Sequence, residues 1–247
     1  MFPKYAESCM VCGEELKYRA KPEPLECYFC GEVKLGCASC GNGHFICKDC
    51  RRNNALDALS DIALRSRSMN PKEIAEQMMA HPSVPVIGGE HHAIVAAALL
   101  AALRNGEPVF YRGKKIKIND ILLERAIDRT WLDRIPSSTC SNYGACGASL
   151  AAGAVFSLLT DATCDTTRAK ERQIAMEVTN HISSEIAWYR GTCCKLSVRL
   201  AIDGACLAIK EYLGIELPHE GGRCQQARIK PLSCLGPSCL YFREETG

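Results

Sequence analysis

The chain has 247 residues, 47% of them hydrophobic, which is enough to bury a full core and to form one or two domains. Its 30 Lys and Arg residues nearly balance 28 Asp and Glu residues, and the net charge of +2 is spread evenly. No segment gathers the positive charge that phosphate neutralisation needs, so nucleic acid is not an expected partner.

The sequence also argues against export and membrane insertion. The opening residues, MFPKYAES, lack the basic and then apolar pattern of a secretory signal. The longest purely apolar run, Ala93 to Leu103, has eleven residues and is too short to span a bilayer. We therefore expect a soluble, cytoplasmic protein. In a reducing cytosol, C-x-x-C pairs indicate metal binding or redox chemistry more than disulfides.

The first fifty residues contain four C-x-x-C pairs. They supply eight thiolates, enough for two structural zinc ions with four ligands each. A segment this short has almost no apolar core, so bound metal must stabilise it. The predicted metal ligands are Cys9, Cys12, Cys27, Cys30, Cys37, Cys40, Cys47 and Cys50.

Two arrangements of these pairs remain open. Joining neighbouring pairs gives tandem ribbons, whereas joining the first pair to the third and the second to the fourth gives a cross-braced module. His44, in CGNGHFIC, could replace a thiolate. Iron, in a rubredoxin-like site or a cluster, is the alternative to zinc. Because a zinc ion with four protein ligands has no open position, the default role of residues 1–53 is to dock a protein partner or to rigidify the chain.

From Asn54 onward the sequence becomes rich in alanine and leucine, and capping residues divide it into helices. Asn70 and Asn119 are expected to cap two of them, and a small hairpin is expected around residues 112–113. The predicted helices cover 55–67, 71–80, 90–105, 120–134, 145–160, 167–190 and 192–213. The predicted fold is mainly α: a zinc-ribbon or treble-clef-like module (1–53), then an all-helical domain with an irregular, cysteine-rich tail (54–247).

Cysteines of the second half gather at predicted helix starts. Cys140 and Cys146 precede a helix of small residues, and Cys193 and Cys194 stand in RGTCCKLS beside Lys195. Helix N-termini offer free N–H groups and a positive dipole end, which favour thiolates and clusters. Two such ends meeting the tail would form a site fit for an iron–sulfur cluster such as 4Fe–4S. The predicted cofactor ligands are Cys140, Cys146, Cys224, Cys234 and Cys239.

The same region supplies candidate catalytic residues. One of the adjacent thiols would act as nucleophile or sulfur carrier, and one of the histidines in GGEHHAI as acid or base. Neighbouring residues on a helix diverge by about 100°, so at most one histidine faces a given site. The candidates are Cys193, Cys194, His91 and His92. Ordinary packing is the interpretation for Cys164, Cys206 and His181.

The chain resembles an uncharacterised cysteine-rich family of methanogenic archaea and anaerobic bacteria in five stretches: CGNGHFICKDC, GGEHHAIVAAALLAALRNG, CSNYGACGASLAAG, RGTCCKLSVRLAI and SCLGPSCLYF. The resemblance covers most of the chain in order. It implies an anaerobic setting, which suits an oxygen-labile cluster, and it implies no particular reaction.

Together these features predict a cytosolic metalloprotein of anaerobic metabolism. Our first interpretation is an iron–sulfur- or thiolate-dependent enzyme that handles sulfur or a small metabolite, with a small-molecule or sulfur-donor substrate. The alternative is a zinc-dependent adaptor that docks a partner protein through its zinc module and has no catalysis of its own. The sequence leaves the choice between enzyme and adaptor open.

Overall fold

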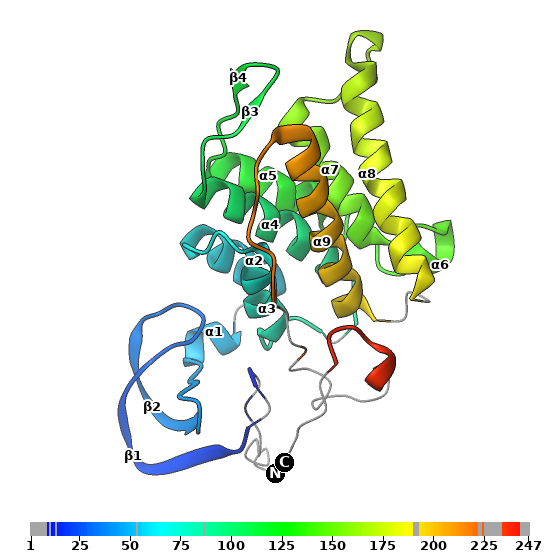
Figure 1. Cartoon of the computed structure of the whole chain (residues 1–247). Helices are drawn as coiled ribbons and strands as arrows, with labels where there is room; N and C mark the ends of the chain where they lie inside the picture. The colour runs from blue at the N-terminus through cyan, green and yellow to red at the C-terminus, as the bar shows by residue number, and fades with distance from the viewer. Residues whose placement is uncertain are drawn as a thin grey trace.

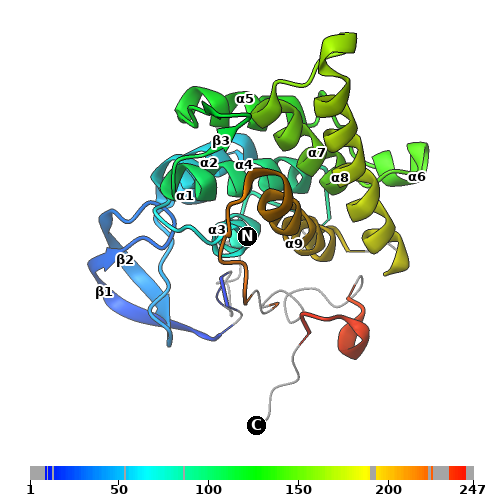
Figure 2. The same cartoon turned by 45° about the horizontal axis from the view of Figure 1, so that its top comes forward.

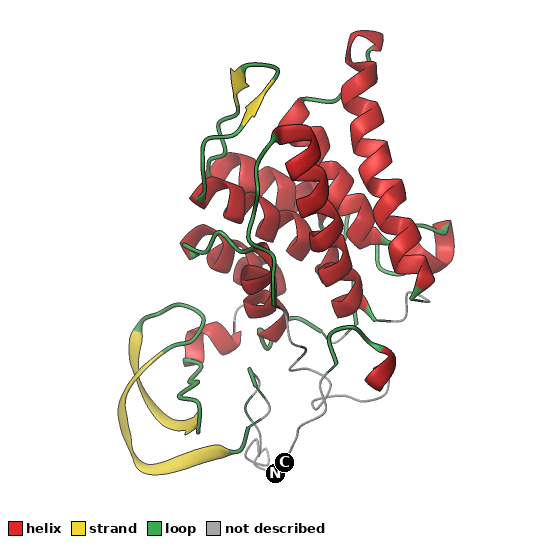
Figure 3. Cartoon of the chain, in the orientation of Figure 1, coloured by secondary structure: helices red, strands yellow, loops and turns green. Residues whose placement is uncertain are grey.

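A β-hairpin at the N-terminal end and a larger group of helices make up the structure (Figures 1 and 3). The computed structural model describes residues 9, 11–12, 14–52, 54–85, 87–189, 193–221, 224 and 234–242. The chain is mainly helical with a zinc-ribbon-like N-terminal module, as predicted. Among the described residues, no helix is long and apolar enough to cross a membrane.

The N-terminal module is built on two antiparallel strands, β1 (Leu16–Glu26) and β2 (Val33–Cys40). Their register shifts between Tyr18 and Glu23, which marks an irregularity in the ladder. The turn that joins them contains Gly31 at φ +68°, a left-handed conformation that favours glycine. A short helix, α1 (Lys48–Arg52), follows the hairpin. Of the eight cysteines, five lie in turns or loops outside these elements, Cys37 and Cys40 lie in β2, and Cys50 lies in α1.

The remaining elements are almost all helical. The helices are α2 (Ala55–Arg65), α3 (Pro71–Ala80), α4 (Glu90–Asn105), α5 (Asp120–Thr130), α6 (Thr139–Tyr143), α7 (Gly147–Thr160), α8 (Ala169–Trp188) and α9 (Cys194–Leu213). Shorter elements are the hairpin strands β3 (Phe110–Tyr111) and β4 (Lys114–Lys115) and the 3-10 turns η1 (Thr166–Arg168) and η3 (Gly236–Ser238). The helices and the small hairpin follow the order expected from the sequence.

Asparagine caps fix the starts of two helices where they were predicted. The Asn70 side chain accepts the backbone N–H of Lys72 at 2.9 Å, and Pro71 occupies the first position of α3. Asn119 accepts the N–H of Leu122 at 3.0 Å and begins α5. Each side chain satisfies an N–H group that has no partner within its helix.

Helix α4 forms the centre of the helical core. It contacts α2, α3, α5, α7 and α9, and every residue from His91 to Leu103 is buried. Its many alanines let neighbouring helices pack closely on all sides. Figures 1 and 2 show α4 enclosed by the other helices. The N-terminal end of α4, which carries the two adjacent histidines, is therefore held in a fixed position.

Helices α7 and α9 pack against α4, and α8 packs against α7 and α9. Helix α8 carries an apolar stripe at helical spacing, and its residues Ile174, Val178, Ile182 and Ile186 are all buried. His181, expected to be a core residue, is exposed, since it lies one position off this stripe. The small, apolar residues of α7 predict a helix that is buried on all sides. Leu150, Ala154 and Ser157 are nevertheless only half-buried, where they border a groove along α8.

The N-terminal module packs against α2 and α3. The rings of Phe29 and His81 stack edge to face with centroids 4.5 Å apart. The Gln77 amide donates to the Tyr28 carbonyl at 3.0 Å. The buried hydrophobic residues of the module and of the helices form one cluster, so the two parts share a core.

The described end of the tail is anchored on α9 by Tyr241. Its hydroxyl donates to Asp203, and its ring lies 5.2 Å from the Lys72 ammonium and 5.4 Å from the Arg199 guanidinium. The Tyr241 carbonyl accepts the N–H of Cys224 at 3.0 Å. Figure 1 shows η3 on the side of the helical domain where α9 begins. The tail thus places Cys224 near buried charges of α9.

Candidate metal centres and thiol site

The structure contains two groups of four ligands in the N-terminal module. The first group consists of Cys9, Cys12, Cys40 and His44, and the second of Cys27, Cys30, Cys47 and Cys50. Within each group, all ligand atoms lie within 4.8 Å of one another. The first and second C-x-x-C pairs therefore join later segments of the chain, not each other. Of the two arrangements considered, the module has the cross-braced one.

The spacing of the sulfur atoms fits tetrahedral zinc. A site with Zn–S bonds of about 2.3 Å places its sulfurs about 3.8 Å apart. The Sγ atoms of Cys27 and Cys50 are 3.8 Å apart, and those of Cys30 and Cys47 are 3.9 Å apart. In the first group, Cys12 and Cys40 are 3.7 Å apart. Each group could therefore hold one metal ion such as zinc.

His44 completes the first group through its Nδ1 atom. This atom lies 3.2 Å from the Cys12 sulfur, 3.3 Å from the Cys40 sulfur and 3.8 Å from the Cys9 sulfur. Burial lowers the pKa of His44, so its imidazole is neutral and has a lone pair for a metal. The glycines of CGNGH make the tight turn that brings His44 back to Cys40.

Cys37, predicted as a ligand, does not belong to either group. It lies within β2 and is exposed, whereas Cys40, at the end of the same strand, is buried. Residues three apart on a strand point to opposite faces of the sheet, so these two sulfurs diverge. The other three pairs lie in turns or at a helix start, where a C-x-x-C spacing does converge.

Backbone N–H groups surround the sulfurs of both groups. Those of Val11 and His44 donate to the Cys9 and Cys40 sulfurs at 3.4 and 3.3 Å. The N–H of Cys47 donates to the Cys27 sulfur at 3.3 Å. Burial alone would raise the pKa of Cys27, but such N–H groups outweigh it and lower the pKa to about 7. These contacts orient the sulfurs and stabilise them as thiolates.

Without a cation, the second group does not ionise completely. Burial and the negative charge of Cys27 raise the pKa of Cys50 well above its ordinary value. A divalent metal ion compensates this repulsion, since a coordinated thiol is deprotonated. The donor set and its electrostatics therefore fit a zinc ion with four protein ligands, which leaves no open position for a substrate.

A different set of thiols lies around Cys194, the first residue of α9. The backbone of Gly88, just before α4, lies close enough to this thiol to act on its pKa, which it lowers. Burial is the main cause that raises the pKa of Cys194. Negative charge on three nearby thiols, those of Cys146, Cys193 and Cys140, raises it further. Cys146 is the residue before α7. Four of the predicted thiols thus lie near one another: Cys146 before α7, Cys193 and Cys194 at the start of α9, and Cys140 in the short helix α6. These four cysteines are called the thiol site.

Both adjacent histidines are buried beside this site and face different neighbours. His92 has its Nδ1 atom 3.1 Å from the Ile135 carbonyl, and its ring lies against Gly147, where an added Cβ would be 2.3 Å from Nε2. His91 has Nδ1 3.0 Å from the Gly88 carbonyl and Nε2 3.3 Å from the Lys195 ammonium. His92 therefore contacts the start of α7, and His91 contacts α9.

Sequence reasoning missed a network of buried charges behind the thiol site. Arg199 is 1% exposed and forms two hydrogen bonds to Glu76 of α3, the one from Nη2 at 2.7 Å. Lys72 pairs with Asp203 at 2.6 Å. Lys195 is 2% exposed and donates to the Met79 carbonyl at 3.0 Å. The partners come from separate segments, so no local motif marks them.

The structure brings only some of the predicted C-terminal ligands together. Cys224 lies near Lys195 and Arg199, since its charge raises the pKa of both. Cys239 lies near Tyr241 of the tail. Apart from the two N-terminal groups, no three ligand atoms in the described part of the chain lie within 4.8 Å of one another. The thiol site is thus not preformed for a single metal ion.

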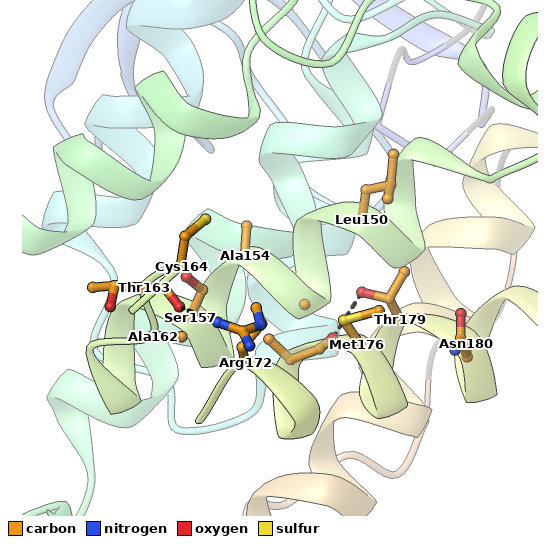
Figure 4. A pocket seen from close by; sticks show the side chains of 12 residues that line it. Leu150, Ala154, Ser157, Ala162, Thr163, Cys164, Arg172, Met176, Thr179 and Asn180 are labelled. Carbon is orange, nitrogen blue, oxygen red and sulfur yellow. Dashed lines mark hydrogen bonds between the residues drawn. The ribbon is translucent and has the colours of Figure 1, made fainter. Parts of the chain in front are cut away.

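The two cysteines interpreted as packing residues differ. Cys206 is buried in α9, as expected, and burial raises its pKa to about 12. Cys164 is exposed and borders the groove between α7 and α8, whose volume is about 500 Å³ (Figure 4). Its interpretation as a buried residue was wrong, because the chain leaves α7 at Asp161 and runs over the surface. The groove is lined mainly by small and apolar side chains and contains none of the thiol-site cysteines.

Comparisons with known proteins place the chain in a family. Residues 59–242 match the family of unknown function DUF5714, and the chain belongs to it. The matched segment includes the thiol site and most of the tail, and it begins after the two metal groups. Searches of curated proteins and of solved structures found no match.

Proposed function

We propose that this member of the DUF5714 family is a metal-binding, thiolate-dependent enzyme that handles sulfur or a small metabolite. Residues 1–53 would form a zinc-stabilised module, and residues 54–247 a catalytic helical domain. The observation that carries the proposal is that Cys146, Cys193 and Cys194 lie near one another at the starts of α7 and α9, with Cys140 of the short helix α6 nearby. Helix N-termini favour negatively charged sulfur, which is the reactive form of cysteine.

In the simplest form of the proposal, one thiol of the site carries sulfur. Cys193 is the better candidate, because burial raises the pKa of Cys194 and so disfavours its thiolate. The Cys193 thiolate would attack the outer sulfur of a persulfide donor. A new S–S bond forms on Cys193, the donor's S–S bond breaks, and the donor leaves as a thiolate. The enzyme then passes the outer sulfur to an acceptor.

A second form of the proposal adds an iron–sulfur cluster. Ligands of a polynuclear cluster are spaced more widely than those of one ion, which suits the looser arrangement of this site. Cys140 and Cys146 would contribute ligands together with tail residues drawn from Cys224, Cys234 and Cys239. The cluster would supply Lewis-acid or electron-transfer chemistry. The anaerobic setting implied by the sequence resemblance supports this form.

One experiment tests both forms. The full chain is purified anaerobically and assayed for zinc, iron, acid-labile sulfide and cysteine persulfide. We expect zinc together with either iron and sulfide or a persulfide on Cys193. The iron and sulfide, or the persulfide, should be absent from Cys146→Ser or Cys193→Ser. They should be present in Cys164→Ser, a matched control at a cysteine beyond the far end of α7. A protein with zinc alone, before and after incubation with an inorganic polysulfide donor, would contradict the proposal.

A docking role for the zinc module is the second candidate, and one observation favours it. Val33 and Leu35 of β2 are 65% and 72% exposed and lie on the same face of the strand. Exposed aliphatic side chains next to a metal-stabilised hairpin suit a protein partner. If the chain is only an adaptor, a Val33→Ser/Leu35→Ser variant loses the cellular function, and Cys193→Ser retains it. The enzyme proposal predicts that Cys193→Ser loses it.

A further inference from the structure

The buried charges around Lys195 are not balanced. Three cations are buried where α3 and α9 meet: Lys72, Lys195 and Arg199. Two carboxylates contact them, with Asp203 paired to Lys72 and Glu76 paired to Arg199. Within the described residues, Lys195 has no carboxylate at ion-pair distance.

None of the described groups that the Lys195 ammonium contacts directly carries a negative charge. Its ammonium donates to the Met79 carbonyl at 3.0 Å and lies 3.3 Å from Nε2 of His91. Both partners are neutral. Burial lowers the pKa of Lys195 to about 8, and the charge of Arg199 lowers it as well. The side chain nevertheless remains a cation at neutral pH, and a buried cation without a counterion is costly.

Among negative groups, Glu76 raises the pKa of Lys195 most, but its carboxylate is already paired with Arg199. After Glu76, the groups whose negative charge raises the pKa of both Lys195 and Arg199 are the thiols of Cys193 and Cys224. Cys193 is half-buried, so part of its surface faces solvent. The excess positive charge therefore lies near a thiol that is partly exposed.

We infer that the thiol site binds a small anion, held by the Lys195 ammonium next to Cys193. The class of substrate is a compact molecule with one negative charge, such as a carboxylate or a sulfur anion. This inference rests on the proposed function and names the substrate class of the same site. A neutral substrate would leave the Lys195 charge uncompensated, and a cationic one would be repelled by it. A site walled by low-dielectric protein and carrying one sign of charge concentrates the opposite ion.

Two alkylating reagents that differ in charge test the inference. Iodoacetate is a small anion, and iodoacetamide is its neutral analogue of nearly the same shape. Each is reacted with the anaerobically purified full chain, and modification of individual cysteines is followed by mass spectrometry. The measured quantity is the iodoacetate-to-iodoacetamide rate ratio at Cys193 divided by that at Cys164. Because thiolate content affects both reagents alike, this ratio reports attraction of the anion and not the acidity of the thiol.

We expect the normalised ratio to be about 10 at low salt, within the range known for electrostatic steering. It should fall to about 1 in Lys195→Gln and stay near 10 in Lys210→Gln, which removes an exposed lysine of the same helix. A wild-type ratio near 1, a high ratio unchanged in Lys195→Gln, or protection of Cys193 from both reagents would overturn the inference. A high ratio in a protein that carries neither persulfide nor cluster would instead reject the proposed function and leave the anion site standing.

Discussion

The ammonium nitrogen of Lys195 lies 3.3 Å from Nε2 of His91, and both side chains are buried. His91 therefore accepts a hydrogen bond at Nε2, and its Nδ1–H donates to the Gly88 carbonyl at 3.0 Å. Burial and then the charge of Lys195 hold the pKa of His91 well below its ordinary value. We expect His91 to remain neutral and to position Lys195, and not to serve as a proton donor.

Replacing Lys195 by Met should stabilise the fold at pH 7. The pKa of Lys195 is lowered from 10.5 to about 8, so the folded state disfavours the charged form. The wild type should therefore gain stability as pH rises from 8 to 10.5, where the unfolded chain retains the proton longer. Lys195→Met should be more stable by up to about 3 kcal/mol at pH 7, with the difference shrinking towards pH 10. Urea unfolding at both pH values measures it, and a difference independent of pH would contradict the assignment.

Removing the carboxylate of Glu76 should be strongly destabilising. Arg199 is 1% exposed, and Glu76 is its only ion-pair partner among the described residues. Glu76→Gln leaves a buried guanidinium without its counterion, so we expect a loss of about 3 kcal/mol in unfolding free energy. Glu216→Gln is the matched control, since Glu216 pairs with the exposed Lys210 and this substitution should change the stability little. Equal losses of unfolding free energy in the two variants would show that the buried ion pair contributes no more to stability than the exposed one.

Zinc content should separate His44 from Cys37. The purified protein should contain two zinc ions per chain. His44→Ala and Cys40→Ser each remove a ligand of the first group, so these variants should retain one ion under mild chelation. Cys37→Ser should retain both, because Cys37 belongs to neither group. Metal analysis after gel filtration is the measurement. Loss of a zinc ion in Cys37→Ser would show that Cys37 is a zinc ligand after all.

Adding a methyl group at Gly147 should disturb His92. The new Cβ would lie 2.3 Å from Nε2 of His92, and the start of α7 leaves the ring little room to move. We expect Gly147→Ala to cost about 1–3 kcal/mol of stability. In the double variant Gly147→Ala/His92→Ala, the clash is removed and the combined loss should be smaller than the sum of the single losses. Additive losses, measured by denaturant unfolding, would rule out direct contact between these two residues.

Features set by local sequence were predictable. The caps at Asn70 and Asn119 and the buried stripe of α8 follow from hydrogen bonding and helical period, which involve near neighbours. The C-x-x-C pairs likewise indicated metal ligands. Cys37 was assigned wrongly because its role depends on the phase of a strand, which the sequence did not reveal.

Features set by contacts between distant segments were not predictable. Lys195 meets His91 across 104 positions of sequence, and Arg199 meets Glu76 across 123. No spacing rule links such residues, and lysine, arginine and glutamate are ordinary on exposed helix faces. Only the packing of α3, α4 and α9 shows that these charges are buried together. Cys164 was misjudged for a related reason, since its exposure depends on where the chain leaves α7.

The most direct test of the thiol site is native mass spectrometry of the full chain purified without oxygen. It reports zinc, iron and added sulfur on the same molecules. We expect a mass that corresponds to two zinc ions and to added sulfur or an iron–sulfur cluster. The added sulfur or cluster should be absent from Cys193→Ser or Cys146→Ser and present in Cys164→Ser. Molecules that carry only zinc in all four proteins, including after exposure to inorganic polysulfide, would contradict it.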